Sequence, residues 1–126
     1  MLTTTGGFSG FSVDDLERAT AFYRDTLGLK VMSDSMGLRL NVTGGAPVFV
    51  YEKPNHVPAT FTVLNLEVPD IDVAVDELSA AGVKLEIYPG TNQDERGIAR
   101  GRAANRGPDI AWFLDPAGNI LSVLQG

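Results

Sequence analysis

The stretch FSVDDLERA, residues 11–19, decides the fold because it recurs later in the chain as LEVPDIDVA, residues 66–74. The two copies align at a constant offset of 55 positions. After a slip of one residue the alignment resumes at an offset of 54, so that GLKV at 28–31 falls on GVKL at 82–85. A repeat at this spacing predicts two copies of one supersecondary unit.

Each copy opens with a strand-like stretch that runs into a helix. The first helix is predicted to begin near Asp14, with Glu17 completing a capping-box pattern, and to end at Gly28. In the second copy Asp70 is the predicted cap and Gly82 the end. The apolar stripes that would bury the two helices are Leu16, Ala19, Phe22 or Tyr23, and Leu27 in the first copy, and Ile71, Ala74, Val75 and Leu78 in the second.

Short strands follow each helix. They are predicted at residues 29–32, 38–42 and 48–51 in the first copy and at residues 83–88, 110–114 and 120–124 in the second. The expected fold is therefore α+β, with the order β-α-β-β-β occurring twice. The predicted organisation is a single domain at 1–126, made of a first module at 7–53, a linker at 54–58 and a second module at 59–126.

Composition excludes several classes of function. Ten basic and sixteen acidic residues give a formal charge of −6, which is the wrong sign for binding nucleic acid. The chain has no cysteine, which removes disulfides and thiolate metal sites and favours a cytoplasmic location. We expect neither a signal peptide at the start nor a membrane-spanning segment, and hence no membrane partner.

The segment from Thr91 to Pro108 carries Arg96, Arg100, Arg102 and Arg106 without helical or strand periodicity. It is predicted to be a mobile loop, and long loops in small domains are often functional. A basic loop could attract an anionic ligand. The alternative, which we favour, is a solvated loop whose arginines meet nearby Asp and Glu side chains.

Three segments together carry a family resemblance: VDDLERA at 13–19, FYRDTLGL at 22–29 and FLDPAGNI at 113–120. In this order and with this internal repeat, the chain resembles the vicinal oxygen chelate superfamily of glyoxalases, bleomycin resistance proteins and extradiol dioxygenases. The resemblance implies paired βαβββ modules that form a curled mixed sheet around a concave cavity, commonly in a homodimer.

The resemblance also implies where a metal would be held. The family's enzymes bind a divalent metal through His or Glu side chains from four strands, and three of those positions fall here on Phe8, Val63 and Ser122. The fourth falls on the strand at 48–51, which has no acid, although Glu52 lies just beyond it. A phenyl ring, an isopropyl group and a hydroxyl are poor ligands for such metals, so we expect no metal and no cofactor.

Strand alternation predicts which side chains line the cavity, because every second residue faces the same side of a sheet. The residues so placed on or beside the cavity are Phe8, Ser12, Phe49, Tyr51, Asn65, Glu67, Trp112 and Ser122. A mainly apolar pocket with a few polar groups is typical of small-molecule sites. Glu67 could serve as a general base or bind a cation, or it could be a solvated acid near a strand end; the sequence does not separate these roles.

His56, the only imidazole, lies between prolines in the linker and is interpreted as a surface residue. From this position we expect neither a two-histidine metal site nor a histidine-based catalytic dyad within one subunit. Two functional hypotheses remain. The favoured one is a metal-free, homodimeric protein that binds a small aromatic or amphipathic molecule and sequesters a drug or metabolite, as in antibiotic resistance. The alternative is a lyase or dioxygenase-like enzyme using Glu67, with or without Glu52, as base or metal ligand.

Overall fold

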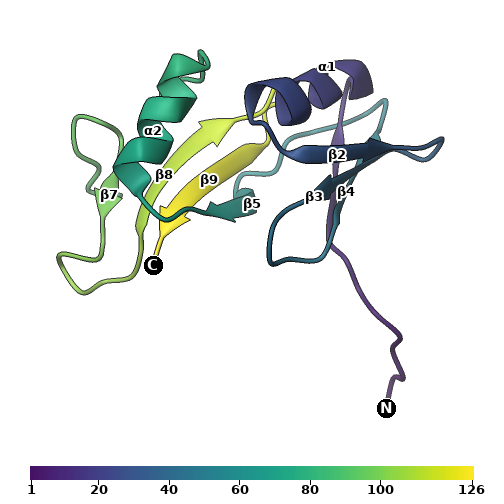
Figure 1. Ribbon diagram of the computed structural model, residues 1–126, viewed down its shortest axis with the longest axis horizontal. Helices are drawn as coiled ribbons and strands as arrows, with labels where there is room; N and C mark the ends of the chain where they lie inside the picture. Colours follow the sequence, from purple (N-terminus) through teal and green to yellow (C-terminus); the bar gives the residue numbers. More distant parts are fainter. The chain divides into compact units, whose positions relative to one another are not determined.

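The computed structural model describes all 126 residues, Met1–Gly126, and divides them into two compact units, Met1–Pro58 and Ala59–Gly126 (Figure 1). The first unit contains β1 (Gly10–Val13), α1 (Leu16–Thr20), a π-helix (Ala21–Thr26), β2 (Lys30–Ser33), β3 (Leu38–Asn41) and β4 (Val48–Glu52). The second contains β5 (Thr62–Glu67), α2 (Ile71–Ala80), β6 (Leu85–Glu86), β7 (Ala99–Arg100), β8 (Asp109–Leu114) and β9 (Ile120–Gln125). The prediction of an α+β fold built from a repeated unit is confirmed.

The two sheets have the same topology. The first has the order β1-β4-β3-β2, and the second has the order β5-β9-β8-β6, with the short β7 pairing with β8. In each sheet the opening strand runs parallel to the closing strand, β1 to β4 and β5 to β9, while the other pairs are antiparallel. Each unit is therefore a mixed sheet whose crossover passes through its helix.

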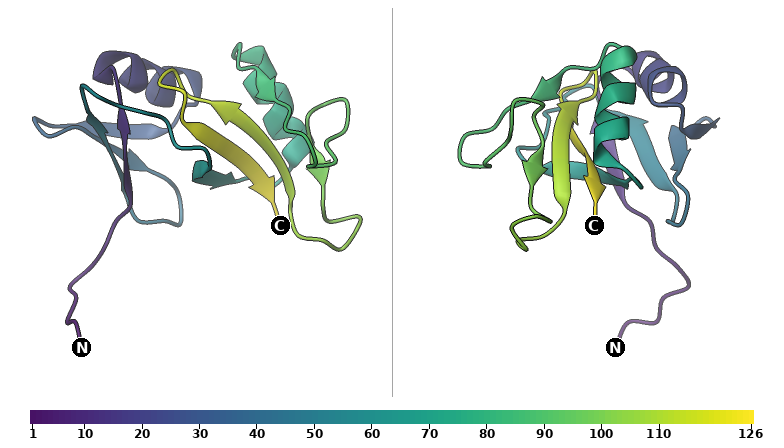
Figure 2. Two further views of the ribbon diagram at one scale, coloured as in Figure 1. Left: turned by 180° about the vertical axis from the view of Figure 1, so that it is seen from behind. Right: turned by 60° about the vertical axis from the view of Figure 1, so that its left-hand side comes forward.

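Each sheet buries one face beneath its own helix, as Figure 2 shows for α2 across β8 and β9. The buried apolar strand residues alternate along the strands: Phe11, Val13, Leu38, Leu40, Val48 and Val50 in the first unit, and Leu64, Leu66, Ala111, Phe113, Leu121 and Val123 in the second. The predicted stripe of α2, formed by Ile71, Ala74, Val75 and Leu78, is buried as well. In the first helical segment Tyr23, rather than Phe22, is fully buried. Neither α-helix has the length and apolar character that crossing a membrane requires.

The first helix begins one residue later than predicted. Asp15, not Asp14, is the N-cap, and its carboxylate accepts a hydrogen bond from the Arg18 N–H. The repeat gives the reason, because Asp15 aligns with Asp70, which caps α2 by accepting from the Asp72 and Val73 N–H groups. The predicted capping box at Asp14 is therefore wrong, whereas the cap at Asp70 is confirmed.

Both helices also receive a cap from the last strand of their own sheet. The Leu16 N–H donates to Glu52 Oε1 at 3.0 Å, and the Ile71 N–H donates to Gln125 Oε1 at 2.9 Å. Leu16 and Ile71 are repeat equivalents, so Glu52 and Gln125 are equivalent too. This equivalence extends the repeat to the closing strands β4 and β9.

The π-helix accounts for the one-residue slip in the repeat. Between Ala19 and Gly28 the first copy has one residue more than the second has between Ala74 and Gly82. Both ends are fixed, because the alanines are buried and the glycines, at φ of 72° and 82°, terminate the helical segments in left-handed geometry. The extra residue is absorbed by widening one turn, and the Leu27 N–H bonds to the carbonyl of Phe22, five residues back.

The strand predicted at residues 83–88 is reduced to Leu85–Glu86. The reason is Gln93, whose side chain takes the place of a strand partner. Its Oε1 accepts from the Tyr88 N–H at 2.8 Å, and its Nε2 donates to the Glu86 and Gly97 carbonyls, each at 2.8 Å. Because this side-chain amide already bonds to the backbone groups at Glu86 and Tyr88, those groups are not available for pairing with another strand, and β6 ends early.

The loop at residues 91–108 is more structured than predicted, since it contains β7 and a fully buried Ile98. Three of its four arginines meet nearby acids, as the favoured interpretation expected, and Arg106 does not. Arg100 binds both Asp72 oxygens and Asp94, Arg96 binds Asp72 and Asp76, and Arg102 lies 3.6 Å from Asp109. The hydrogen bonds from Arg100 lower the pKa of Asp72 despite some desolvation, and the two acids in turn raise the pKa of Arg100.

A candidate ligand pocket on the open face of the first unit

The face of the first sheet opposite α1 is aromatic. The register pairs Phe49 with Gly10 and Arg39, and Tyr51 with Ser12, so these side chains share the open face. The rings of Phe49 and Tyr51 stack at 5.7 Å with an interplanar angle of 18°, and Phe8 meets Phe49 edge-on at 6.4 Å. Four of the predicted site residues, Phe8, Ser12, Phe49 and Tyr51, are therefore together on one face of this unit.

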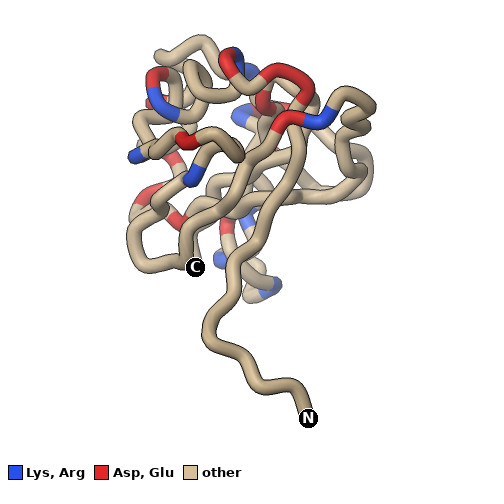
Figure 3. Tube along the Cα trace, turned by 90° about the vertical axis from the view of Figure 1, so that its right-hand side faces the viewer, with Lys and Arg blue, Asp and Glu red and all other residues tan.

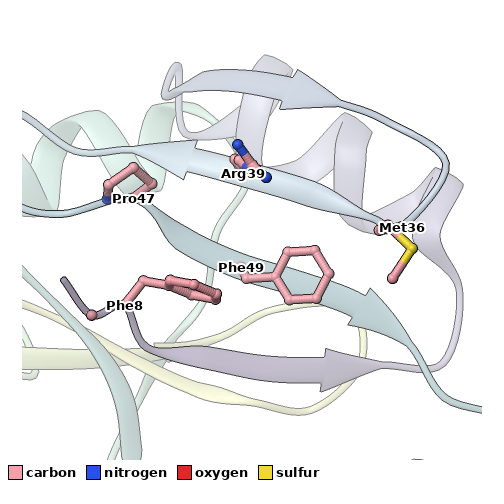
Figure 4. Close-up of a pocket in the computed structure, with 6 residues that line it drawn as sticks. Phe8, Met36, Arg39, Pro47 and Phe49 are labelled. Atoms are coloured by element: carbon pink, nitrogen blue, oxygen red, sulfur yellow. The ribbon is translucent and has the colours of Figure 1, made fainter. Parts of the chain in front are cut away.

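A pocket of about 390 Å³ lies on this face. Figure 4 shows Phe8, Phe49 and Met36 along it, with Arg39 and Pro47 on the side of β3. Phe8 and Met36 are 72% and 73% exposed, which is high for large apolar side chains and leaves them available to a ligand. The volume is in the range of about 300–1,000 Å³ that is usual for small-molecule sites.

Two glycines make room for the Phe49 ring. A Cβ atom at Gly10 would lie 3.1 Å from the Phe49 carbonyl oxygen and 3.6 Å from Phe49 Cβ. At Gly37, which has φ of 155°, a Cβ would lie 2.4 Å from the Val50 carbonyl oxygen and 3.1 Å from the Phe49 ring. The absence of side chains at both positions lets this ring lie flat against the sheet and form the floor of the pocket.

His56 is not the free surface residue that the sequence suggested. Its side chain is half-buried, and Nδ1 lies 2.7 Å from the Ser12 hydroxyl. Within the linker, the His56 N–H also bonds to the Lys53 carbonyl. The imidazole therefore fastens the linker to β1 beside Tyr51, and the only histidine of the chain is engaged with a site residue.

The open face of the second sheet is mostly satisfied by its own hydrogen bonds. The Ser122 hydroxyl, fully buried, donates to Asn65 Oδ1 at 2.6 Å, and the Trp112 Nε1–H donates to Thr62 Oγ1 at 3.2 Å. Trp112 and Ser122 are also register neighbours. Three of the predicted site residues, Asn65, Trp112 and Ser122, thus bind one another or Thr62. Glu67, on the same strand face as Asn65, is exposed.

Alternation misplaced one residue of β5. The register between β5 and β9 shifts between Thr62 and Leu64, so that Thr62 pairs with Ile120 and Asn65 with Ser122. Thr62 therefore lies on the open face where strict alternation had placed Val63. A one-residue irregularity of this kind moves the side chains before it to the opposite side of the sheet. The pattern of apolar residues does not show that it is there.

A second pocket, of about 410 Å³, lies in the loop of the second unit. Arg100 and Arg106 contribute to it together with Asn92 and Ile110. The Arg100 guanidinium is already bound by Asp72 and Asp94, which leaves Arg106 as the pocket's available cation. This loop pocket is less aromatic than the pocket on the first sheet.

Two units that each carry a helix on one sheet face and leave the other face open define a class of small α+β proteins built by tandem repetition of βαβββ. The chain belongs to the Glyoxalase/Bleomycin resistance protein/Dioxygenase superfamily, whose sequence model matches residues 7–123. The family resemblance read from the sequence is confirmed. No curated protein matches the chain significantly.

Solved structures show the same fold at low sequence identity. TnmS3, an antibiotic binding protein from Streptomyces sp. CB03234, has a TM-score of 0.67 and 23% identity, covering 98% of each chain. A putative glyoxalase family protein from Bacillus anthracis has a TM-score of 0.69 and 18% identity, covering 100% of this chain and 99% of that one. The fosfomycin resistance protein FosX from Listeria monocytogenes has a TM-score of 0.67 and 14% identity, covering 99% and 95%.

The residues at the family's metal positions do not fit a divalent metal. Glu52 and Gln125 are equivalent, so the residues three positions before them, Phe49 and Ser122, are equivalent as well. The fourth metal position therefore falls on the phenyl ring of Phe49 rather than on an acid. Glu52 itself lies opposite the buried Val13, on the helix side of the sheet, where it caps α1. No group of three or more His, Asp or Glu side chains is placed to hold a metal.

Sequence reasoning missed Met36, Arg39 and Pro47 as pocket residues and His56 as the partner of Ser12. Arg39 could have been found, because it lies between the apolar Leu38 and Leu40 and alternation turns it to the open face. Met36 and Pro47 belong to turns, where alternation gives no direction. The His56 contact joins positions 44 apart and has no local signal.

Proposed function

We propose that this protein binds a small planar aromatic molecule, without a metal, in the pocket on the open face of the first sheet. The observation that carries the proposal is the aromatic cluster on this face, in which the half-buried Phe49 lies against Gly10 and Gly37 and is flanked by the exposed Phe8 and Tyr51. Aromatic rings gain from burial and from stacked or edge-on contacts, so such a cluster favours a planar ligand. The donor set at the family's metal positions supports a metal-free mode of binding.

The biological role that we propose is sequestration of a drug or metabolite. TnmS3 is described as an antibiotic binding protein and FosX as a fosfomycin resistance protein, and both share this fold. The open face of the first sheet offers binding surface, while Glu52, the only acid in its strands, lies on the helix side and accepts from the first N–H of α1. His56 is hydrogen-bonded to Ser12. This arrangement supports binding rather than turnover.

We also propose that the protein is a cytoplasmic homodimer. The strands β1 and β2 lie at the edges of the first sheet, and β5 lies at an edge of the second, so unpaired backbone groups are available along them. Light scattering tests the assembly: a mass of two chains over a wide concentration range is expected. A single-chain mass throughout would refute the dimer without affecting the pocket.

Ligand binding is tested by thermal shift and calorimetry with a neutral planar probe, naphthalene-2-methanol. A ligand at a hundredfold excess over Kd stabilises the folded protein by about 2.7 kcal/mol, which a melting curve resolves. Phe49→Ala should abolish the shift, whereas Phe61→Ala should leave it unchanged, because Phe61 is an exposed phenylalanine that does not line the pocket. The same affinity in Phe49→Ala as in the wild type would contradict the proposed site.

The metal-free state is tested on the same samples. Protein purified without chelator should carry no stoichiometric transition metal, and the probe should bind equally before and after EDTA treatment. The enzymatic alternative predicts the opposite: one metal per chain, or turnover of a glyoxalase or dioxygenase substrate that disappears in Glu67→Gln. Either result would replace the binding proposal with the enzymatic one.

A further inference from the structure

We propose that the pocket of the first unit selects planar aromatic molecules that carry a negative charge, with Arg39 as the charge partner. This inference rests on the proposed function and adds the chemical class of its ligand.

The strand residues on the open face of the first sheet include two cations and no acid. The register pairs Lys30 with Asn41 and Met32 with Arg39, while the neighbours of these pairs, Leu38 and Leu40, are fully buried on the other side. Lys30 and Arg39 are therefore on the open face, and Glu52, the only acid in these strands, is on the helix side. The protein as a whole has a formal charge of −6, so the charge of the strand residues on this face is opposite in sign to the net charge of the protein.

The opposite sign is found on the equivalent face of the second sheet. Glu67 lies on the face of Asn65, and Glu86 pairs in register with Trp112, so both acids are on that open face. The one arginine in the strands of this sheet, Arg100 on β7, pairs with the buried Asp109 and therefore lies on the helix side. The positive charge is thus a property of the first unit and not of the repeated scaffold.

Arg39 is only loosely neutralised within the protein. Its nearest acid is Asp34, at 4.0 Å, the outer limit of an ion pair, and the Arg39 side chain is 61% exposed. The other oxygen of Asp34 accepts hydrogen bonds from the Met36 and Gly37 N–H groups at 2.7 and 3.1 Å, so this carboxylate mainly holds the turn before β3. The guanidinium retains donors for an anion, and its planar fork matches a carboxylate.

The remainder of the pocket is uncharged. Gly7, Phe8, Met36, Pro47 and Phe49 line it besides Arg39, and the N-terminal segment that leads into β1 has no charged residue, as Figure 3 shows. An aromatic ring lying against Phe8 and Phe49 would place a ring substituent beside β3, where Arg39 lies (Figure 4). An anionic substituent gains a charge-assisted hydrogen bond there, whereas a cationic one meets a like charge with no acid in the pocket to offset it.

Three probes of one shape test this selection by calorimetry on the full-length protein: naphthalene-2-carboxylate, naphthalene-2-methanol and naphthalene-2-methylammonium. The wild type should bind the carboxylate about tenfold more tightly than the alcohol, and the ammonium most weakly. The preference for the carboxylate should fall as salt is raised from 50 to 500 mM, because the pair is partly exposed to solvent.

Arg39→Met should remove the preference, so that the affinities for the carboxylate and the alcohol come within about twofold of each other. Arg18→Met is the matched control, because it makes the same change in charge on α1, away from the pocket, and should keep the preference. Asp34→Asn should strengthen carboxylate binding a few-fold, since the amide oxygen can still accept from the turn while the competing charge is gone.

Two outcomes would overturn the inference while leaving the proposed function intact: equal affinity of the wild type for carboxylate and ammonium, or an equal loss of all three probes in Arg39→Met. If none of the three probes binds the wild type, the proposed function itself fails. Folding of each variant is checked by its melting temperature and circular dichroism before titration.

Discussion

The two units use one scaffold in opposite ways at the same pair of positions. In the first unit a glycine faces a phenylalanine, Gly10 with Phe49, and in the second an asparagine faces a serine, Asn65 with Ser122. The small residue beside the large one exposes an aromatic ring. In the second unit the asparagine side chain accepts a hydrogen bond of 2.6 Å from the buried serine hydroxyl. The comparison teaches that the repeat fixes the backbone of both units. One pair of side chains then decides whether the open face presents an aromatic ring to a ligand or forms hydrogen bonds among its own side chains.

The largest expected effects lie on the helix-covered face of the sheet, which each unit has. Leu40→Ala in the first unit and Leu121→Ala in the second each remove a fully buried side chain beneath a helix. Each should lower the free energy of unfolding by about 2–5 kcal/mol, because the lost contacts leave a cavity. Urea denaturation measures both. A loss below about 1 kcal/mol in one unit only would show that the units are not built around equivalent cores.

Exchanging the residues at the equivalent positions 10 and 65 tests whether they cause the difference between the two open faces. Gly10→Asn should cost about 1–3 kcal/mol, since its Cβ would crowd the Phe49 backbone, and it should weaken binding of naphthalene-2-methanol because the ring is displaced. Asn65→Gly should cost about 1–2 kcal/mol through the lost hydrogen bond and the added chain entropy, with no effect on that probe. Denaturation and calorimetry on both variants check this. Weaker binding in Asn65→Gly alone would place the ligand on the second unit.

The caps contributed by the closing strands test the equivalence of Glu52 and Gln125. Glu52→Ala and Gln125→Ala should each destabilise the protein by about 1 kcal/mol, because each leaves the first N–H of a helix without its partner. Glu52→Gln should change stability by less than about 0.5 kcal/mol, since the second unit already uses glutamine for this contact. A large loss of ligand or metal binding in Glu52→Gln would instead give this acid the role that the enzymatic alternative assigns to it.

The smallest effect concerns the arginine and aspartate cluster, which only the second unit has. The hydrogen bonds from Arg100 keep the pKa of Asp72 below its ordinary value, so this carboxylate stabilises the fold above the unfolded-state pKa of about 4 and loses that contribution as the pH falls through the folded-state pKa. The melting temperature of Asp72→Asn should be lower than that of the wild type at pH 7. The gap should narrow below about pH 4, and a constant gap from pH 7 to pH 3 would show that the charge of Asp72 is not what matters.

Much of the fold could be predicted because it is specified locally. The repeated motif, the glycines that end both helical segments and the stripe of α2 are all short-range patterns. The failures have physical causes that the sequence does not display. The Gln93 side chain replaced strand pairing at Tyr88, and an extra residue in the first helical segment was absorbed by a π-helical turn. The cap at Asp15 is a different case, because its alignment with Asp70 in the repeat was available in the sequence.

The candidate site divides in the same way. Alternation placed Phe49, Tyr51 and Ser12 on one face because that depends only on neighbours along a strand. It could not give the partners of these residues. The contacts of Ser12 with His56 and of Asn65 with Ser122 join positions 44 and 57 apart, and the irregularity at Val63 shifts the register without a sequence signal.

The central claim is that the open face of the first unit holds the ligand without a metal. The most direct measurement is a titration of isotope-labelled protein with naphthalene-2-carboxylate in the presence of EDTA, followed by amide chemical shifts in NMR spectra. The largest shifts should fall at Gly7, Phe8, Arg39 and Phe49 and should be absent in Phe49→Ala. Shifts confined to the loop at residues 91–108, or binding that appears only when a divalent metal is added, would contradict the account.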